Sequence, residues 1–245
     1  MPLHIQNLTK TYANGTQALK DITLTIPTGL TVIAGPTGAG KSTLLRILAT
    51  LQEPDRGSVH LNGIDILNRR EAACRSIAWL SHDPGVHPSL SPWERLDHVA
   101  LRSGIIDDRL RKATVEQLLR KTDLWEQRNR PMTDDAHAHT LATQRRLALA
   151  VTLIGSPALI LVDEPATALD PTERTPFLEL LTELAEDRIV LIAATTTHSL
   201  TGPRPRMAIM DRGELRQIVE PPSFTSAPTA LFPYPSHRSV PIIRA

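Results

Sequence analysis

The chain has 245 residues, of which 41% are hydrophobic and 22% charged, as in an ordinary globular protein. Its formal net charge of +1 gives no support for binding to nucleic acid or to an anionic membrane surface. Its single cysteine, Cys74, excludes an internal disulfide, and with no secretory signal in view we expect a reducing cytoplasm as its location.

The most apolar stretch of the sequence runs from Leu147 to Val162 and is interrupted by Gly155-Ser156-Pro157. A membrane-spanning helix needs about 20 uninterrupted apolar residues, so this stretch predicts a buried helix followed by a buried strand. We therefore expect the chain to work at a membrane only by docking onto another chain.

The N-terminal part of the sequence predicts strands. Residues 3–27 alternate between apolar and polar side chains around Asn14-Gly15, which favours an antiparallel hairpin with a turn at those two residues. Further elements are expected in the order of a strand over 30–34, a helix over 44–48, and strands over 57–62 and 77–80.

The segment from about 84 to 143 has a different character, because it is rich in charged residues with helical spacing. Pro92 begins one expected helix, and residues 109–124 form an amphipathic one. We interpret this segment as a helical subdomain inserted into the sheet. The elements expected after it are a helix over 141–154, a strand over 158–162, a helix over 175–186, a strand over 189–194, and a hairpin of 207–210 with 214–218.

The alternation of apolar strands with helices predicts an α/β fold, with a mostly parallel core sheet covered on both faces. Residues 1–220 are expected to form this domain, to which the N-terminal hairpin and the inserted helices belong. Residues 221–245 are rich in proline and lack periodicity, so an extended or disordered tail is expected there.

Two motifs predict nucleotide chemistry. The first matches the phosphate-binding loop pattern and lies between a strand and a helix: Gly35-Pro36-Thr37-Gly38-Ala39-Gly40-Lys41-Ser42-Thr43. Its backbone N–H groups and the helix N-terminus attract phosphate, Lys41 reaches the β- and γ-phosphates, and the Ser42 hydroxyl is placed to bind Mg²⁺. The second is the buried strand that ends in Asp163 and Glu164. We expect Asp163 to hold the Mg²⁺ hydration shell and Glu164 to accept a proton from the attacking water.

The stretch from Asp163 to Asp170 resembles the second nucleotide motif and following loop of the ABC ATPases, and the resemblance extends over about residues 3–219. It implies a P-loop NTPase fold of the ABC type that binds ATP and Mg²⁺, with Asp170 near the nucleotide and Tyr12 stacked on adenine. It also implies a dimer that encloses two ATP molecules, and a membrane-spanning transporter subunit on a separate chain that the closing dimer drives from the cytoplasmic face.

Three positions depart from the family pattern, and all three would face the γ-phosphate. His82 stands where the family carries a glutamine. The family's Leu-Ser-Gly-Gly-Gln signature aligns with residues 139–143, where Thr140 keeps a hydroxyl while Leu141 and Ala142 replace glycines. A histidine is expected after the strand over 189–194, but Thr195 stands in its register, with His198 three residues on. Either His198 takes this role, or the role is lost.

These departures leave alternatives open. The favoured hypothesis is an ATP-hydrolysing transporter subunit, slow because of its altered signature, and the stretch from Leu48 to Val59 resembles exporters more than importers. The alternative is a regulatory subunit that uses ATP as a clamp. A homodimer and a heterodimer with another ABC ATPase are both compatible with the sequence. No basic patch or coiled-coil insertion suggests a nucleic-acid partner.

Overall fold

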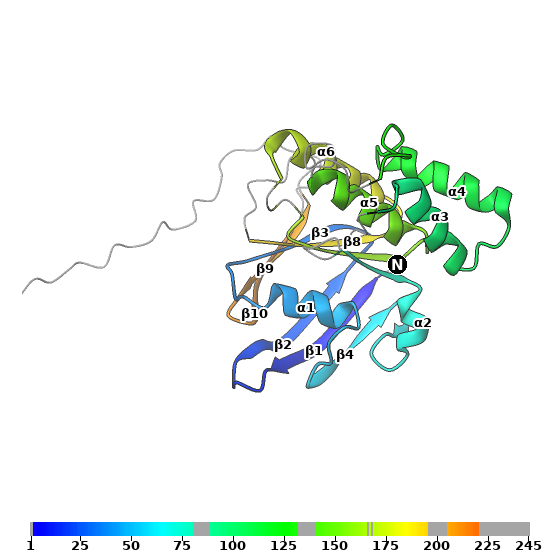
Figure 1. The fold of residues 1–245 in the computed structure, drawn as a ribbon. Helices are drawn as coiled ribbons and strands as arrows, with labels where there is room; N and C mark the ends of the chain where they lie inside the picture. The colour runs from blue at the N-terminus through cyan, green and yellow to red at the C-terminus, as the bar shows by residue number, and fades with distance from the viewer. Residues whose placement is uncertain are drawn as a thin grey trace, which may run out of the picture.

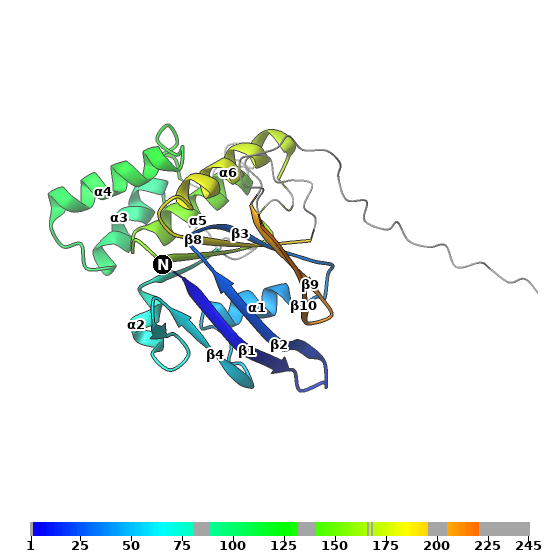
Figure 2. The ribbon, with the colours of Figure 1, turned by 180° about the vertical axis from the view of Figure 1, so that it is seen from behind.

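The computed structural model describes residues 2–80, 89–131, 141–165, 167, 169–195 and 205–220. Within these residues the strands form one four-stranded and one six-stranded sheet. Figures 1 and 2 show the two sheets with α1 (Lys41–Leu48) beside both, and with α5 (Leu141–Leu153) and α6 (Pro171–Leu184) beyond the larger sheet. The layers agree with the expected α/β class.

The smaller sheet contains the predicted N-terminal hairpin. Strands β1 (Leu3–Thr11) and β2 (Gln17–Ile26) pair antiparallel, which confirms the predicted turn between them. On its other side β1 pairs antiparallel with β4 (Arg56–Leu61), and β4 pairs with the short β5 (Ile64–Asp65). The sequence predicted β4 as a strand but not its place in this sheet, and β5 was missed because two residues show no periodicity.

The larger sheet is mostly parallel, as predicted, and has the strand order β10-β9-β3-β8-β7-β6. Only the last hairpin departs from this direction, because β10 runs antiparallel to β9. The bounds of its strands are β3 (Gly29–Ala34), β6 (Ile77–Leu80), β7 (Leu159–Asp163), β8 (Ile189–Ala194), β9 (Arg206–Asp211) and β10 (Glu214–Val219). Ligands bind outside the carboxyl ends of parallel strands, so the loops after β3, β7 and β8 mark the edge of interest.

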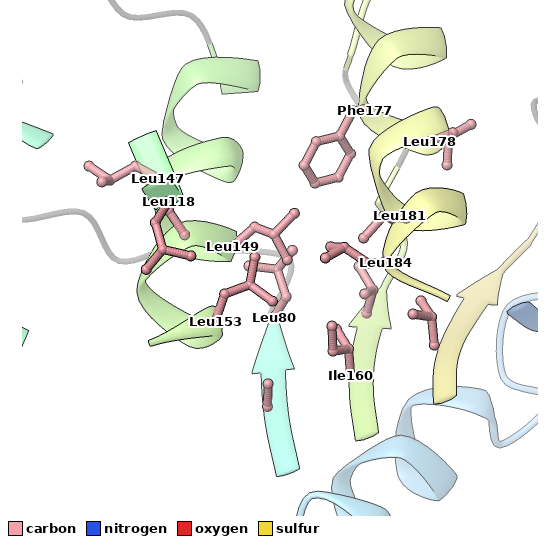
Figure 3. Close-up of a cluster of buried hydrophobic side chains, with 14 of the residues drawn as sticks. Leu80, Leu118, Leu147, Leu149, Leu153, Ile160, Phe177, Leu178, Leu181 and Leu184 are labelled. Carbon is pink, nitrogen blue, oxygen red and sulfur yellow. The ribbon is translucent and has the colours of Figure 1, made fainter. Parts of the chain in front are cut away.

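Each central strand of this sheet is apolar on both faces because both faces are covered. In β7, Leu159 and Leu161 pack toward α1 and the hairpin, whereas Ile160 and Val162 pack toward α5 and α6. Figure 3 shows the hydrophobic cluster on the face of the sheet that α5 and α6 cover, in which Phe177 of α6 lies among leucines of α5 and α6. These side chains hold the carboxyl end of β7 in a fixed position.

Two helices that lie between β6 and β7 in the sequence pack beside α5, at the margin of the fold. Helix α3 (Pro92–Arg102) begins with a capping box, in which the Ser91 hydroxyl accepts from the Glu94 N–H. Helix α4 (Asp108–Lys121) begins at the Asp107 cap. Both agree with the helices expected in the inserted segment. Across the described ranges, none of the helices combines the length and apolar character of a membrane span.

Two helices differ most from the prediction. Helix α6 begins at Pro171 rather than near residue 175, because the Asp170 carboxylate accepts from the N–H groups of Thr172 at 2.8 Å and Glu173 at 3.1 Å. The five-residue α2 (Arg70–Cys74) was not predicted, since it is too short to show a helical repeat.

Candidate functional site: the edge where β3, β7 and β8 end

The phosphate-binding loop connects β3 directly to α1, as the sequence predicts. Gly40 stands at the helix N-cap with φ of 99°, and no side chain caps the helix there. A β-carbon on Gly40 would lie 2.3 Å from the Ala18 carbonyl oxygen, and one on Gly35 would lie 2.1 Å from the Met210 carbonyl oxygen. Only glycine fits at these two positions, and the uncapped N-terminus of α1 offers its N–H groups to an anion.

Lys41 is the cation of this loop, and its side chain is buried, with 6% of its surface exposed. Its ammonium group donates to the carbonyl oxygens of Gly35 at 2.8 Å and Pro36 at 3.1 Å, and lies 3.9 Å from Glu164 Oε1. Burial lowers the pKa of Lys41, and the nearby carboxylates of Glu164 and Asp163 partly oppose this shift. The cation therefore faces the two predicted acids across the loop.

Ser42 and Asp163 form the second pair in the site. The Ser42 hydroxyl donates to Asp163 Oδ1 at 3.2 Å, although the two residues are 121 positions apart in the sequence. Asp163 is the last residue of β7 and pairs with Ala193 of β8. A serine hydroxyl and a carboxylate are hard oxygen ligands of the kind that Mg²⁺ takes beside phosphate. Together with the open α1 N-terminus and Lys41, this donor set fits a nucleoside triphosphate with its Mg²⁺.

Glu164 follows β7 in a left-handed backbone conformation, with φ of 50°. Its N–H donates to the Ala193 carbonyl at 2.9 Å. Its carboxylate receives the Thr195 hydroxyl on Oε1 and the Thr167 hydroxyl on Oε2, the latter at 3.4 Å. With 28% of the side chain exposed, Glu164 has access to water while its direction is set by these two hydroxyls.

Thr195 is a site residue to which the sequence analysis assigned no positive role. It follows β8 and lies beside the end of β7, where its hydroxyl donates to Glu164 and accepts from the Lys41 ammonium at 3.5 Å. The signal was its register immediately after a buried strand, at the edge where the other site residues were expected. The resemblance to the family pointed to a histidine there and so hid the threonine.

Tyr12 lies just after β1, and its hydroxyl is anchored on the helix that follows the phosphate loop. Its oxygen is 3.0 Å from Thr43 Oγ1, and it donates to Gln52 Oε1 at 3.3 Å. The structure thus brings Tyr12 to the loop. Stacking of its ring on adenine remains a prediction.

The other predicted residues that the structure describes lie in the phosphate loop or at the start of α6. Ala39 is buried in the loop, where its N–H donates to the Pro36 carbonyl at 3.1 Å, and Gly38 is in a left-handed conformation with φ of 82°. Asp170 caps α6, and the Thr172 hydroxyl and the N–H groups of α6 lower the pKa of its carboxyl. A contact of Thr37 or Asp170 with nucleotide remains a prediction, and the candidates His82, Thr140 and His198 lie outside the described residues.

Comparisons with known proteins identify the family of this site. The family model described as ABC transporter matches residues 19–167, which include the phosphate loop and the Asp163–Glu164 pair. The phosphonates import ATP-binding protein PhnC 2 of Synechococcus sp. (strain JA-2-3B'a(2-13)) is 35% identical over 199 residues, which cover 76% of this chain and 72% of that protein. The daunorubicin/doxorubicin resistance ATP-binding protein DrrA of Streptomyces peucetius is 30% identical over 215 residues, covering 87% of this chain and 63% of DrrA.

Solved structures give the same result. The ATP-binding cassette MJ0796, solved as a dimer in a post-hydrolysis state with ADP and Pi, superposes with a TM-score of 0.77 at 25% identity, and the match covers 91% of this chain and 100% of that one. The structure of cbiO1 from Clostridium perfringens, with a TM-score of 0.76 at 23% identity over 88% of this chain and 87% of that one, shares the fold. The chain described here therefore belongs to the ATP-binding domains of ABC transporters, within the P-loop ATPases.

Proposed function

We propose that the chain hydrolyses ATP to drive a membrane-spanning transporter subunit that is a separate chain. The observation that carries this proposal is the meeting of Lys41, Ser42, Asp163 and Glu164 at one edge of the sheet. A cation, a hydroxyl and two carboxylates at that edge are the groups that phosphoryl transfer from ATP to water requires.

The residues divide into binding and chemical roles. The N–H groups at the start of α1 and the Lys41 ammonium would hold the phosphates of ATP, and Ser42 with Asp163 would hold Mg²⁺. Bound Mg²⁺ supplies neutralisation of charge on the β- and γ-phosphates. On ATP binding, Lys41 exchanges its two carbonyl contacts within the loop for phosphate oxygens, which bear a full negative charge.

Glu164 would act as the general base that removes a proton from the attacking water. Its access to solvent and the two threonine hydroxyls that orient its carboxylate support this role. A subunit that used ATP only as a clamp would need no oriented carboxylate beside the phosphate loop, and Glu164 is therefore the residue that favours a motor.

For the assembly, we propose a dimer of two such chains. Ala142, which replaces a glycine of the family signature, has 3% of its surface exposed and packs into the core cluster around α5 and α6. Its methyl group therefore points into the protein rather than toward the outer surface of α5. The alternative is a heterodimer with an ATPase whose signature is intact.

The direction of transport is a separate question. Because one relative is named as an import protein and another as a resistance protein, export stays a prediction from the sequence.

ATP binding and turnover by the purified chain, with Lys41→Ala beside it, test this proposal. We expect wild type to bind ATP and to hydrolyse it in the presence of Mg²⁺, and Lys41→Ala to bind at least about tenfold more weakly, because a charge-assisted contact is lost. Lys112→Ala is the matched control, since Lys112 pairs with Asp108 on the exposed surface of α4. Tight binding without turnover, alone or with an intact second ATPase, would instead support the ATP-clamp alternative.

A further inference from the structure

Arg145 is the largest side chain among the fully buried residues, although it is charged. It lies in the second turn of α5, and 2% of its surface is exposed. One guanidinium nitrogen, Nη1, donates to the Pro165 carbonyl, whereas no described residue accepts a hydrogen bond from the buried Nη2. No ion pair joins Arg145 to an acid within the described part of the chain. Burial lowers the pKa of Arg145, as expected for a cation removed from water without a counter-ion.

Stability alone gives no reason for an arginine at this position. A buried cation without a carboxylate partner loses its hydration, and a single carbonyl does not replace it. An apolar side chain of similar volume in the same space is commonly neutral or stabilising. A residue that is costly to bury points to a role in the site that it contacts.

The hydrogen bond of Arg145 ends directly beside the proposed general base. Pro165 follows Glu164, which has a left-handed φ of 50° that a glutamate rarely adopts. On the N-terminal side of this turn, the Glu164 N–H is held by the Ala193 carbonyl of β8 at 2.9 Å. On the C-terminal side, Arg145 of α5 holds the Pro165 carbonyl. The strained residue is therefore fixed at both ends by two different elements.

We infer that Arg145 is a positioning residue that locks the turn at Glu164 and so directs its carboxylate toward the phosphate loop. This inference rests on the proposed role of Glu164 in ATP hydrolysis. Because Arg145 belongs to α5, whose first residues align with the family's signature, it also ties the start of that helix to the base.

The test compares Arg145→Met with Arg145→Lys in the full chain. Methionine fills much of the same space without a donor, and lysine keeps one charged donor. For Arg145→Met we expect kcat to fall about tenfold, with the Kd for ATP within about twofold of wild type and the urea midpoint unchanged or higher. Arg145→Lys is expected to recover part of the loss in kcat. Arg128→Met is the matched control, because Arg128 also donates to a backbone carbonyl, that of Trp125, at 2.7 Å.

A wild-type kcat in Arg145→Met would overturn the inference. So would a fall in kcat accompanied by equal losses in ATP affinity and in the urea midpoint, because that result marks a structural role. If Arg145→Met does not fold, the comparison rests on Arg145→Lys, where a loss of kcat with intact ATP binding supports the inference and a lower urea midpoint with unchanged kcat overturns it. Failure of the proposed function is distinguishable, since wild type itself would then show no turnover.

Discussion

Removal of the Thr195 hydroxyl tests the geometry of the site without altering a charged residue. Valine has nearly the same shape as threonine but cannot donate to Glu164 Oε1. A hydrogen bond to a charged group contributes about 1.5–3 kcal/mol, and because Glu164 is 28% exposed we take the lower figure. This corresponds to about a tenfold fall in kcat for Thr195→Val.

The KM for ATP is expected to change less than about twofold in this variant, because the only bond from Lys41 to Thr195 is the long one of 3.5 Å. Steady-state ATP hydrolysis at saturating Mg²⁺ measures both quantities. Thr195→Ser should retain most of the rate. Thr167→Val is the matched control, since the Thr167 hydroxyl lies 3.4 Å from the same carboxylate and should matter less. Equal rates in Thr195→Val and wild type would refute the assignment of Thr195 to the site.

Three further changes test other parts of the account. Gly40→Ala should weaken ATP binding about tenfold or more by calorimetry, because the new β-carbon meets the Ala18 carbonyl at 2.3 Å; unchanged affinity would contradict the loop geometry. Phe177→Ala should lower the free energy of unfolding by about 3–5 kcal/mol in urea, since Phe177 is fully buried, and a loss below about 1 kcal/mol would contradict its place in the core. Because Thr172 and the α6 N–H groups lower the pKa of Asp170 in the folded state, its stabilisation is complete above the unfolded pKa and is lost as pH falls through the folded pKa. At pH values below about 4, the urea midpoint of wild type should therefore decrease as the pH falls, and that of Asp170→Asn should decrease less. An equal decrease in both proteins would count against this role of Asp170.

Local patterns were sufficient to predict much of the fold. The phosphate loop and the acids after β7 are continuous in sequence, so their spacing already identifies them. The strands of the larger sheet are apolar on both faces, which distinguished β7 and β8 from the alternating hairpin. By contrast, α2 and β5 are too short to show a repeat, and the start of α6 depends on a cap rather than on periodicity.

The contacts within the site were harder to predict, because they join residues from separate elements. Thr195 reaches Glu164 only because β8 lies next to β7, and this strand order was not deduced from the sequence. Arg145 stands in the polar run Thr143-Gln144-Arg145-Arg146 at the start of α5, which gives no sign that its guanidinium is the one buried against Pro165. Sequence patterns locate the strand ends, whereas the packing of β7, β8 and α5 decides which side chains meet there.

The rate of ATP hydrolysis by Glu164→Gln, compared with wild type, tests the central claim most directly. Glutamine keeps the size of the side chain but cannot accept a proton from water, and positioned general bases contribute about 10²- to 10⁴-fold to rates. We predict that kcat falls at least about 100-fold while the Kd for ATP stays within about twofold, and that the exposed control Glu186→Gln is unaffected. A kcat in Glu164→Gln equal to that of wild type would contradict the assignment of Glu164 as the general base.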